Sequence, residues 1–302
     1  MCHQSTGEAA VRYTADVVSL HRRLSFRGLS AQLGPDQVLH REHRGDGLVT
    51  LAVPTRHLPH RYLLGLQGFR LSQYLQLGWI CEETVYSGAL FSEPAHGASP
   101  DDVHVICLSG DGAIQGYLCL TACGDGGGSW DLHDPDRPAF PVEEAHDINL
   151  FDHVEALPGV RTDGVRELKR FVHARTLTDK QQRLRVTLEL LYGMGRVLQG
   201  VTPSVRTLVG DLEEHVALRH LLLAGLDVQL VEGTSPGLAE RDLLHHMYLA
   251  RASVKPFVAH LPAEEVVEER IALLEQALAS EDLFAGTSVM SRSRGTLHRV
   301  AG

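Results

Sequence analysis

A β-hairpin signal in the first half of the chain is the feature that most constrains its fold. Two runs rich in β-forming residues, VHVICLSG (103–110) and AIQGYLCLTAC (113–123), flank the dipeptide Asp111-Gly112. Asp-Gly is favoured in tight hairpin turns, in which both central residues take positive φ. The two runs are therefore predicted to pair as neighbouring antiparallel strands of a sheet.

Helix and strand patterns alternate along the rest of the chain. Further strands are predicted at 46–54, 165–174, 204–211 and 226–233, and helices at 8–33, 63–79, 179–200, 212–225, 236–252 and 262–280. The Gly/Asp/Pro-rich segment 123–141 is predicted to be a long loop, either functional or poorly ordered, and the Ser/Arg/Gly-rich tail to be loose. This order predicts an α/β (α+β) fold, in which a mixed central sheet is flanked by helices and the chain ends in helices.

Composition and charge narrow the class of protein. Of 302 residues, 43% are hydrophobic and 22% charged, as in ordinary soluble proteins. There is no apolar run of the ~18–20 residues that span a membrane, and no secretory signal. Five cysteines at irregular spacing argue against a disulfide framework, so a cytoplasmic protein without membrane contact is predicted. The formal net charge of −10 disfavours a general nucleic-acid-binding surface but leaves a local basic patch open.

The sequence lacks the motifs of a metal site and of a covalent nucleophile. Cys119 and Cys123 lie far apart along a predicted strand, and His245 and His246 diverge on a predicted helix. There is no G-x-S-x-G, and the glycine-rich segment 124–129 lacks the strand and helix that frame a phosphate loop. We therefore predict no metal site and no tightly bound cofactor.

The segment VRELKRFVHARTL (165–177) concentrates positive charge in an acidic chain, and it is too apolar to be simply surface. Its charged and titratable side chains are Arg166, Glu167, Lys169, Arg170, His173 and Arg175. If it is extended, Glu167, Lys169, Phe171 and His173 share one face, and Leu168, Arg170 and Val172 share the other. Two interpretations stay open. The segment is either a central strand whose charges pair with one another, or a strand that presents a carboxylate and a guanidinium to an anionic or carbonyl substrate.

The pattern Glu167-x-x-Arg170-Phe171 resembles the E-x-x-R-F strand of the GNAT (N-acetyltransferase-like) superfamily. It is most similar to the branch of acyl-homoserine-lactone synthases and N-acyl-amino-acid synthases. The hairpin at 103–120 and the strand–helix–strand pattern at 204–233 also resemble that family. The resemblance implies a GNAT-like acyltransferase core at 63–233. It leaves an N-terminal helical and strand extension at 1–62, a helical C-terminal extension at 234–285 and a flexible tail at 286–302.

The resemblance also implies an enzyme that transfers an acyl or aminoacyl group directly. An amine, hydroxylamine or hydroxyl acceptor attacks a thioester or ester carbonyl between two splayed strands, and backbone N–H groups stabilise the oxyanion. Glu167 is the expected proton acceptor, and Arg170 is expected to orient a carboxylate or to brace Glu167. His173 is a second candidate base, with an ordinary surface histidine as the alternative. A basic rim is expected to bind the donor through Arg175, Lys180, Arg183 and Arg185.

The donor stays open between three hypotheses. The family's Q/R-x-x-G-x-G/A loop, which binds the CoA pyrophosphate at a helix N-terminus, has no counterpart in ARTLTDKQQRLR (174–185). The first hypothesis is an acyl donor on a carrier protein or CoA, and the second is an aminoacyl-tRNA, which the acidic charge disfavours. The third is a non-catalytic GNAT-like protein that senses a ligand. The Arg-, Ala-, Leu-, Gly- and His-rich composition is associated with a high-GC bacterium and with secondary metabolism, including antibiotic biosynthesis.

Overall fold

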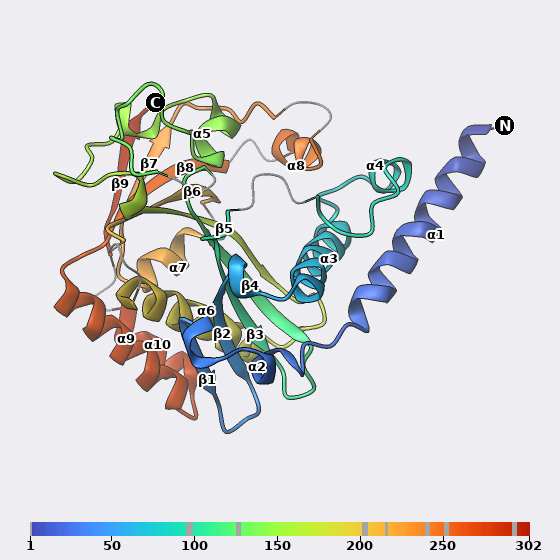
Figure 1. The fold of residues 1–302 in the computed structure, drawn as a ribbon, viewed down its shortest axis with the longest axis horizontal. Helices are drawn as coiled ribbons and strands as arrows, with labels where there is room; N and C mark the ends of the chain where they lie inside the picture. The colour runs from blue at the N-terminus through green and yellow to red at the C-terminus, as the bar shows by residue number, and fades with distance from the viewer. Residues whose placement is uncertain are drawn as a thin grey trace.

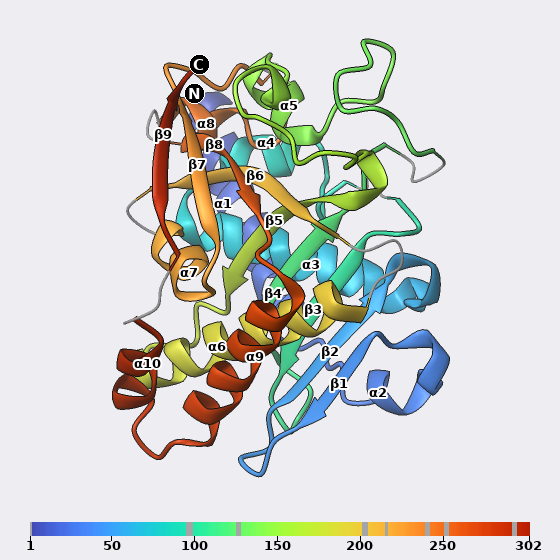
Figure 2. The ribbon, with the colours of Figure 1, turned by 90° about the vertical axis from the view of Figure 1, so that its left-hand side faces the viewer.

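A twisted nine-stranded sheet forms the centre of the described part of the chain (Figures 1 and 2). The structure is a computed structural model that describes residues 2–94, 99–124, 128–200, 205–214, 217–238, 242–250, 254–291 and 295–302. The strand order is β1-β2-β3-β4-β5-β6-β8-β7-β9; β5/β6 and β7/β9 pair in parallel, and the other neighbours pair antiparallel. The strands are β1 (His40–His43), β2 (Val49–Pro54), β3 (Val103–Leu108), β4 (Ile114–Thr121), β5 (Val165–His173), β6 (Thr207–Glu213), β7 (Asp227–Glu232), β8 (Val254–His260) and β9 (Leu297–Ala301).

Helices cover both faces of the sheet. Figure 1 shows α1, α3 and α4 on one side, and α6, α7, α9 and α10 on the other. None of the described helices combines the length and the hydropathy that crossing a bilayer requires. The helices are α1 (Cys2–Arg22), α2 (Leu29–Gln32), α3 (His60–Leu77), α4 (Glu82–Ser87), α5 (Pro141–His146), α6 (Lys180–Gly200), α7 (Leu218–Leu223), α8 (His245–Ala250), α9 (Glu264–Ala279) and α10 (Leu283–Ser291).

The hydrophobic cores follow from strand alternation. On β4, Leu118 and Leu120 join the core beneath α6 and α9, whereas Tyr117 and Cys119 join the core beneath α3. The predicted helix 179–200 is confirmed as α6, and its apolar stripe, which includes Leu188, is buried in the first core. A third, smaller core packs α5 against β5, β6, β7 and β8. The predicted α/β class, a mixed sheet flanked by helices, is therefore confirmed.

The predicted hairpin is confirmed as β3 and β4, but its turn differs from the expected one. Of the two central residues only Gly112 has a positive φ, +85°. Gly112 N–H donates to the Ser109 carbonyl (2.8 Å), and the Ser109 N–H donates to the Ala113 carbonyl (2.9 Å). This is the longer hairpin loop in which one left-handed glycine closes the turn. A Cβ at Gly112 would lie 2.2 Å from Arg27 N, so the close approach of the chain also requires glycine.

Local sequence patterns misassigned several elements of the two ends. The first helix ends at Arg22 rather than 33, and the predicted all-helical C-terminal part contains β8, which pairs with β6 and β7. The tail predicted to be loose contains β9, which pairs with β7. These strands are stabilised by partners far away in sequence, which outweigh weak local patterns. The sheet thus runs across the predicted boundaries at 62/63, 233/234 and 285/286.

Candidate functional site

A cavity of about 1390 Å³ lies between the sheet and the helices α3, α4, α5 and α8. Its polar wall on the sheet comes from His104, Cys119 and Thr121 of β3 and β4 and from Lys169 of β5. It also reaches the opposite face, because Leu221 of α7 and other members of the core beneath α6 line it too. The cavity therefore passes through the sheet.

The passage is a gap between β5 and β6. These strands pair over three residue pairs, from Val165↔Thr207 to Glu167↔Val209. Beyond that point β5 continues to His173 and β6 to Glu213, and residues 168–172 and 211–213 line the cavity. Gly210 stands where the strands separate: a Cβ there would lie 2.8 Å from the Leu168 carbonyl oxygen. The facing edges of β5 and β6 are thus separated beyond this point. Their peptide N–H and C=O groups, which would pair in a continuous sheet, face the cavity instead.

A β-bulge on β5 reverses the predicted distribution of side chains. Tyr117 pairs with Val172 and Cys119 with Lys169, so one residue of β4 faces two of β5. Arg170 is one of these two and has a left-handed backbone, with φ +59°. The prediction that Phe171 and His173 share a face with Lys169 is therefore wrong. Phe171 and His173 point to the α6 side, whereas Lys169 and Arg170 face the cavity on the α3 side.

The buried Arg70 and the partly buried Arg170 share one carboxylate in the cavity wall. Arg170 donates through Nε (3.1 Å) and Nη2 (2.9 Å) to Glu93 Oε1, and Arg70 of α3 pairs with Glu93 Oε2. Arg70 Nη1 also donates to the Tyr117 hydroxyl (3.0 Å). Although burial raises it, the two arginines lower the pKa of Glu93 to about 2. The cluster therefore carries two positive charges against one negative charge.

Two titratable side chains next to this cluster, His104 and Asp102, are held by hydrogen bonds. His104 Nδ1 lies 2.8 Å from the Tyr117 hydroxyl and its Nε2 lies 2.8 Å from Thr55 Oγ1. Burial and the nearby arginines lower the pKa of His104 to about 3, so it is neutral at pH 7. Burial raises the pKa of Asp102 to about 6, while its oxygens accept from the backbone N–H groups of Ser99 and Ala122.

Glu167 lies at the closed end of the gap, where β5 and β6 still pair. Its side chain is buried, Oε2 accepts from the Val142 N–H of α5 (3.1 Å), and Lys169 Nζ lies 3.6 Å from Oε1. Burial raises the pKa of Glu167 to about 7 against the opposing effect of Lys169. A carboxyl group with this pKa exchanges protons near neutral pH, as a general base requires.

A second acidic group faces Glu167 from the other strand of the gap. Asp211 of β6 lines the cavity and accepts a hydrogen bond from the Tyr248 hydroxyl of α8. The buried His146 of α5 places Nε2 3.9 Å from Asp211 Oδ2 and Nδ1 3.1 Å from Thr234 Oγ1. Burial, together with Asp211, raises the pKa of Tyr248 well above its ordinary value, so this phenol keeps its proton at pH 7.

Solved structures with a similar arrangement include acyl-homoserine lactone synthases. BjaI, a CoA-dependent acyl-homoserine lactone synthase with MTA, is 16% identical, with a TM-score of 0.44 over 80% of this chain and 97% of that chain. TofI in a ternary complex with an inhibitor and MTA is 17% identical, with a TM-score of 0.41 over 74% and 96%. A putative phosphinothricin N-acetyltransferase is 10% identical, with a TM-score of 0.38 over 71% and 99%.

The likeness is one of fold. Neither a family model nor a curated protein matches the sequence.

The structure brings together only part of the predicted site. Arg170 lines the cavity and Glu167 lies beside it, but they do not pair with each other; Arg170 pairs with Glu93. His173 lies on the α6 side, with Nε2 3.0 Å from Thr187 Oγ1, and burial lowers its pKa to about 4. A role for His173 as a base stays a prediction.

The predicted donor-binding residues lie outside the cavity lining, where β5 leads into α6. Arg175, Lys180 and Arg183 are exposed, whereas Arg185 pairs with Asp46 at 2.5 Å. Asp179 caps α6, because its Oδ1 accepts from the Gln182 N–H (2.8 Å). Their part in donor binding stays a prediction. Among the described residues, no group of three or more His, Cys, Asp or Glu side chains is placed to hold a metal ion.

Sequence reasoning missed most of the cavity's polar residues. Glu93 lies after α4, a helix that was not predicted, and Asp211 and Tyr248 gave no local signal. Arg70 did carry one: it is the single charged residue between Leu63 and Leu77 in an otherwise largely apolar helix. A lone arginine in such a helix requires a buried partner, and this pattern could have indicated the site.

Proposed function

We propose that this protein is an acyltransferase that moves an acyl group from a phosphopantetheine thioester, on CoA or a carrier protein, to an amine acceptor. The observation that carries this proposal is the gap between β5 and β6, which opens through the sheet directly beyond Glu167. An extended donor chain fits into a gap between strands. The reactive bond of that donor then lies near Glu167, the acid–base group at the closed end of the gap.

The donor class follows from the shape and chemistry of the gap. Its two edges are strand backbones, so an arm with amide groups can pair with them as an added strand does. Phosphopantetheine has two amides along a thin flexible arm and ends in the thiol that carries the acyl group. The acceptor end of a tRNA lacks such an arm. The acidic net charge of −10 also disfavours the extensive phosphate contacts that tRNA binding requires.

The proposed reaction is direct transfer. The acceptor nitrogen attacks the thioester carbonyl, the C–N bond forms, the C–S bond breaks, and the thiol leaves with a proton. Glu167 takes the proton that the nitrogen loses. Because its side chain is 2% exposed and does not line the cavity, whereas the neighbouring Lys169 does, a single bridging water is proposed to carry the proton. The leaving thiolate takes its proton from solvent, because the Tyr248 hydroxyl donates to Asp211 and keeps its own proton.

The two-arginine cluster is proposed to orient the acceptor. Arg70 and Arg170 face the cavity with one excess positive charge, which favours an acceptor that carries a carboxylate or another anionic group. The bulge at Arg170 holds its guanidinium on this side of the sheet. On the outside, Arg175, Lys180 and Arg183 are proposed to bind the phosphate of the donor.

The test is a transfer assay that compares donors. Acyl-CoAs of increasing chain length, acylated carrier protein and aminoacyl-tRNA are each incubated with the protein and a mixture of amino acids and primary amines. Products are identified by mass spectrometry, and released thiol is measured separately. We expect N-acyl product and thiol release with a thioester donor, and loss of both with Glu167→Gln. If only aminoacyl-tRNA gives a product, the donor is aminoacyl-tRNA and not a thioester. If the protein binds a ligand but forms no product with any donor, it is a ligand sensor.

A further inference from the structure

The segment between β4 and β5 (residues 122–164) builds one wall of the cavity. It carries α5, and Pro141, Glu144 and Ala145 of this helix line the cavity. Its core packs against four strands, including Val165 of β5 and Val209 of β6. The predicted loop 123–141, apart from residues 125–127, which lie outside the described residues, leads into this wall.

Helix α5 contacts both strands that border the gap. Near its N-terminus the Val142 N–H donates to Glu167 Oε2 on β5 (3.1 Å). At its C-terminus His146 faces Asp211 on β6 (3.9 Å), and the Ala145 carbonyl accepts from Gly237 N–H (2.7 Å). A helix of six residues cannot hold this position by its own hydrogen bonds, so other contacts must fix it.

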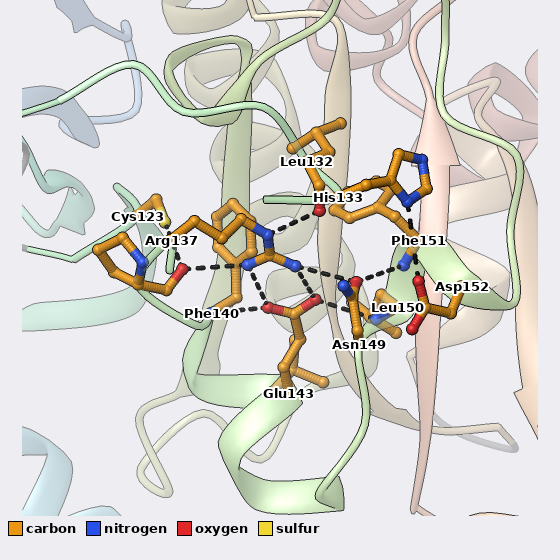
Figure 3. A network of polar contacts seen from close by, with 12 residues as sticks. Cys123, Leu132, His133, Arg137, Phe140, Glu143, Asn149, Leu150, Phe151 and Asp152 are labelled. Carbon is orange, nitrogen blue, oxygen red and sulfur yellow. Dashed lines mark hydrogen bonds and ion pairs between the residues drawn. The ribbon is translucent and has the colours of Figure 1, made fainter. Parts of the chain in front are cut away.

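A buried ion pair supplies those contacts (Figure 3). Arg137 donates from Nη1 to Glu143 Oε2 (2.8 Å) and from Nη2 to Glu143 Oε1 (2.7 Å), and the two side chains are 4% and 2% exposed. Arg137 also donates to the Leu132 and Pro138 carbonyls and to Asn149 Oδ1. A bidentate, fully hydrogen-bonded pair of this kind is geometrically rigid.

Glu143 in turn fixes the first turn of α5 through hydrogen bonds to the backbone. Its Oε2 accepts from the Phe140 N–H (2.8 Å), which caps the helix, and its Oε1 accepts from the Leu150 N–H (2.9 Å), which closes the far end of the loop. Val142 lies between these anchored points. The direction of its N–H toward Glu167 is therefore set by the Arg137–Glu143 pair.

We propose that the Arg137–Glu143 ion pair is a positioning device for Glu167: it holds α5 so that the Val142 N–H bonds the Glu167 carboxylate. The groups that face Glu167 from the other elements are Lys169 and Arg170 on β5, Asp211 on β6, Tyr248 on α8 and Cys123 after β4. Cys123 shares the Pro138 carbonyl with Arg137, whereas Lys169, Arg170, Asp211 and Tyr248 lie on elements outside this segment. Loosening α5 therefore removes one hydrogen bond to the charged form of Glu167 and raises its pKa. The link to catalysis rests on the proposed function.

The test measures the titration of Glu167 directly, without donor or acceptor. Its carboxyl band is followed by infrared difference spectroscopy from pH 5 to pH 9 and assigned with Glu167→Gln. We expect Arg137→Met to move the midpoint upward from about 7 by about half a pH unit or more. Arg137→Lys keeps the charge but not the fork, and should give a smaller shift in the same direction.

Arg161→Met is the matched control. Arg161 lies in the same segment, but it donates to Ser129 and does not contact α5. Its replacement should leave the midpoint unchanged. An unchanged midpoint in folded Arg137→Met overturns the proposal, and so does failure of both Arg137 variants to fold, since the pair would then be a structural requirement. If the midpoint shifts while wild type transfers no acyl group, the positioning role stands and the proposed function fails.

Discussion

Arg170 donates to Glu93 Oε1 from Nη2 at 2.9 Å, although Glu167 lies only three residues before it on the same strand. The partner comes from the loop after α4, 77 residues away in sequence. The bulge at Arg170 makes this possible, because its left-handed backbone turns the side chain to the α3 face. Glu167 instead contacts Lys169 and accepts a hydrogen bond from the Val142 N–H. This separation keeps the strong ion pair away from the carboxyl group whose pKa lies near neutrality.

Glu93→Gln should strongly destabilise the protein. The change leaves the buried Arg70 and the partly buried Arg170 without their shared carboxylate, and breaking a buried pair costs about 3–5 kcal/mol. The free energy of unfolding is measured by urea denaturation. Asp101→Asn is the control, because Asp101 pairs with Arg56 on the surface and should change stability by less than about 1 kcal/mol. Equal effects of the two variants would contradict this prediction.

The stability contributed by Glu167 should depend on pH. Its pKa is raised to about 7 in the folded protein from about 4.5 in the unfolded chain. The folded state therefore binds the extra proton between these values, and stability is lost as pH rises from about 4.5 to about 7. Glu167→Gln removes this term, so relative to wild type it should gain about 2–3 kcal/mol between pH 4 and pH 8. Urea unfolding at several pH values measures the difference; parallel curves for the two proteins would exclude it.

Gly210→Ala should impair donor binding. The added Cβ would lie 2.8 Å from the Leu168 carbonyl oxygen and 2.9 Å from Phe257 Cε1, where β5 and β6 separate. The strands must shift, and the gap changes width. We expect donor affinity to fall by about tenfold or more, which corresponds to ~1.4 kcal/mol. Gly45→Ala is the control, since a Cβ there meets no atom within 4 Å. Calorimetric titration with CoA gives both affinities, and identical values would argue against an arm in the gap.

Charge reversal at Lys180 and Arg183 should weaken donor binding without unfolding. Both side chains are exposed beside the end of β5, so their loss costs no core packing. We expect a several-fold lower affinity for CoA at low salt and a smaller difference at high salt, because exposed charges are screened. Arg12→Glu on α1 provides a reversal remote from this region. If all three reversals weaken binding equally, the effect is general electrostatics and the predicted basic rim has no special part.

Local patterns in the sequence were sufficient to predict the central elements. The alternation of apolar residues, the Asp-Gly turn and the capped stripe of α6 each depend on neighbours within a few residues. The E-x-x-R-F pattern is local in the same way, and it placed Glu167 and Arg170 on one strand. The edge strand β9 and the inserted strand β8 were missed, because their stability comes from pairing with β7 and β6, far away in the chain.

Local sequence patterns were enough to predict the α/β class, the hairpin, the strand of Glu167 and Arg170 and the long segment before it. Which side chains meet depends instead on tertiary packing. A single bulge changed the faces of Phe171 and His173, since side-chain alternation has a period of two and one extra residue reverses it. The partners of Arg170 and Glu167, namely Glu93 and the Val142 N–H, come from distant loops. Their approach is set by the packing of whole elements, and no local pattern encodes it.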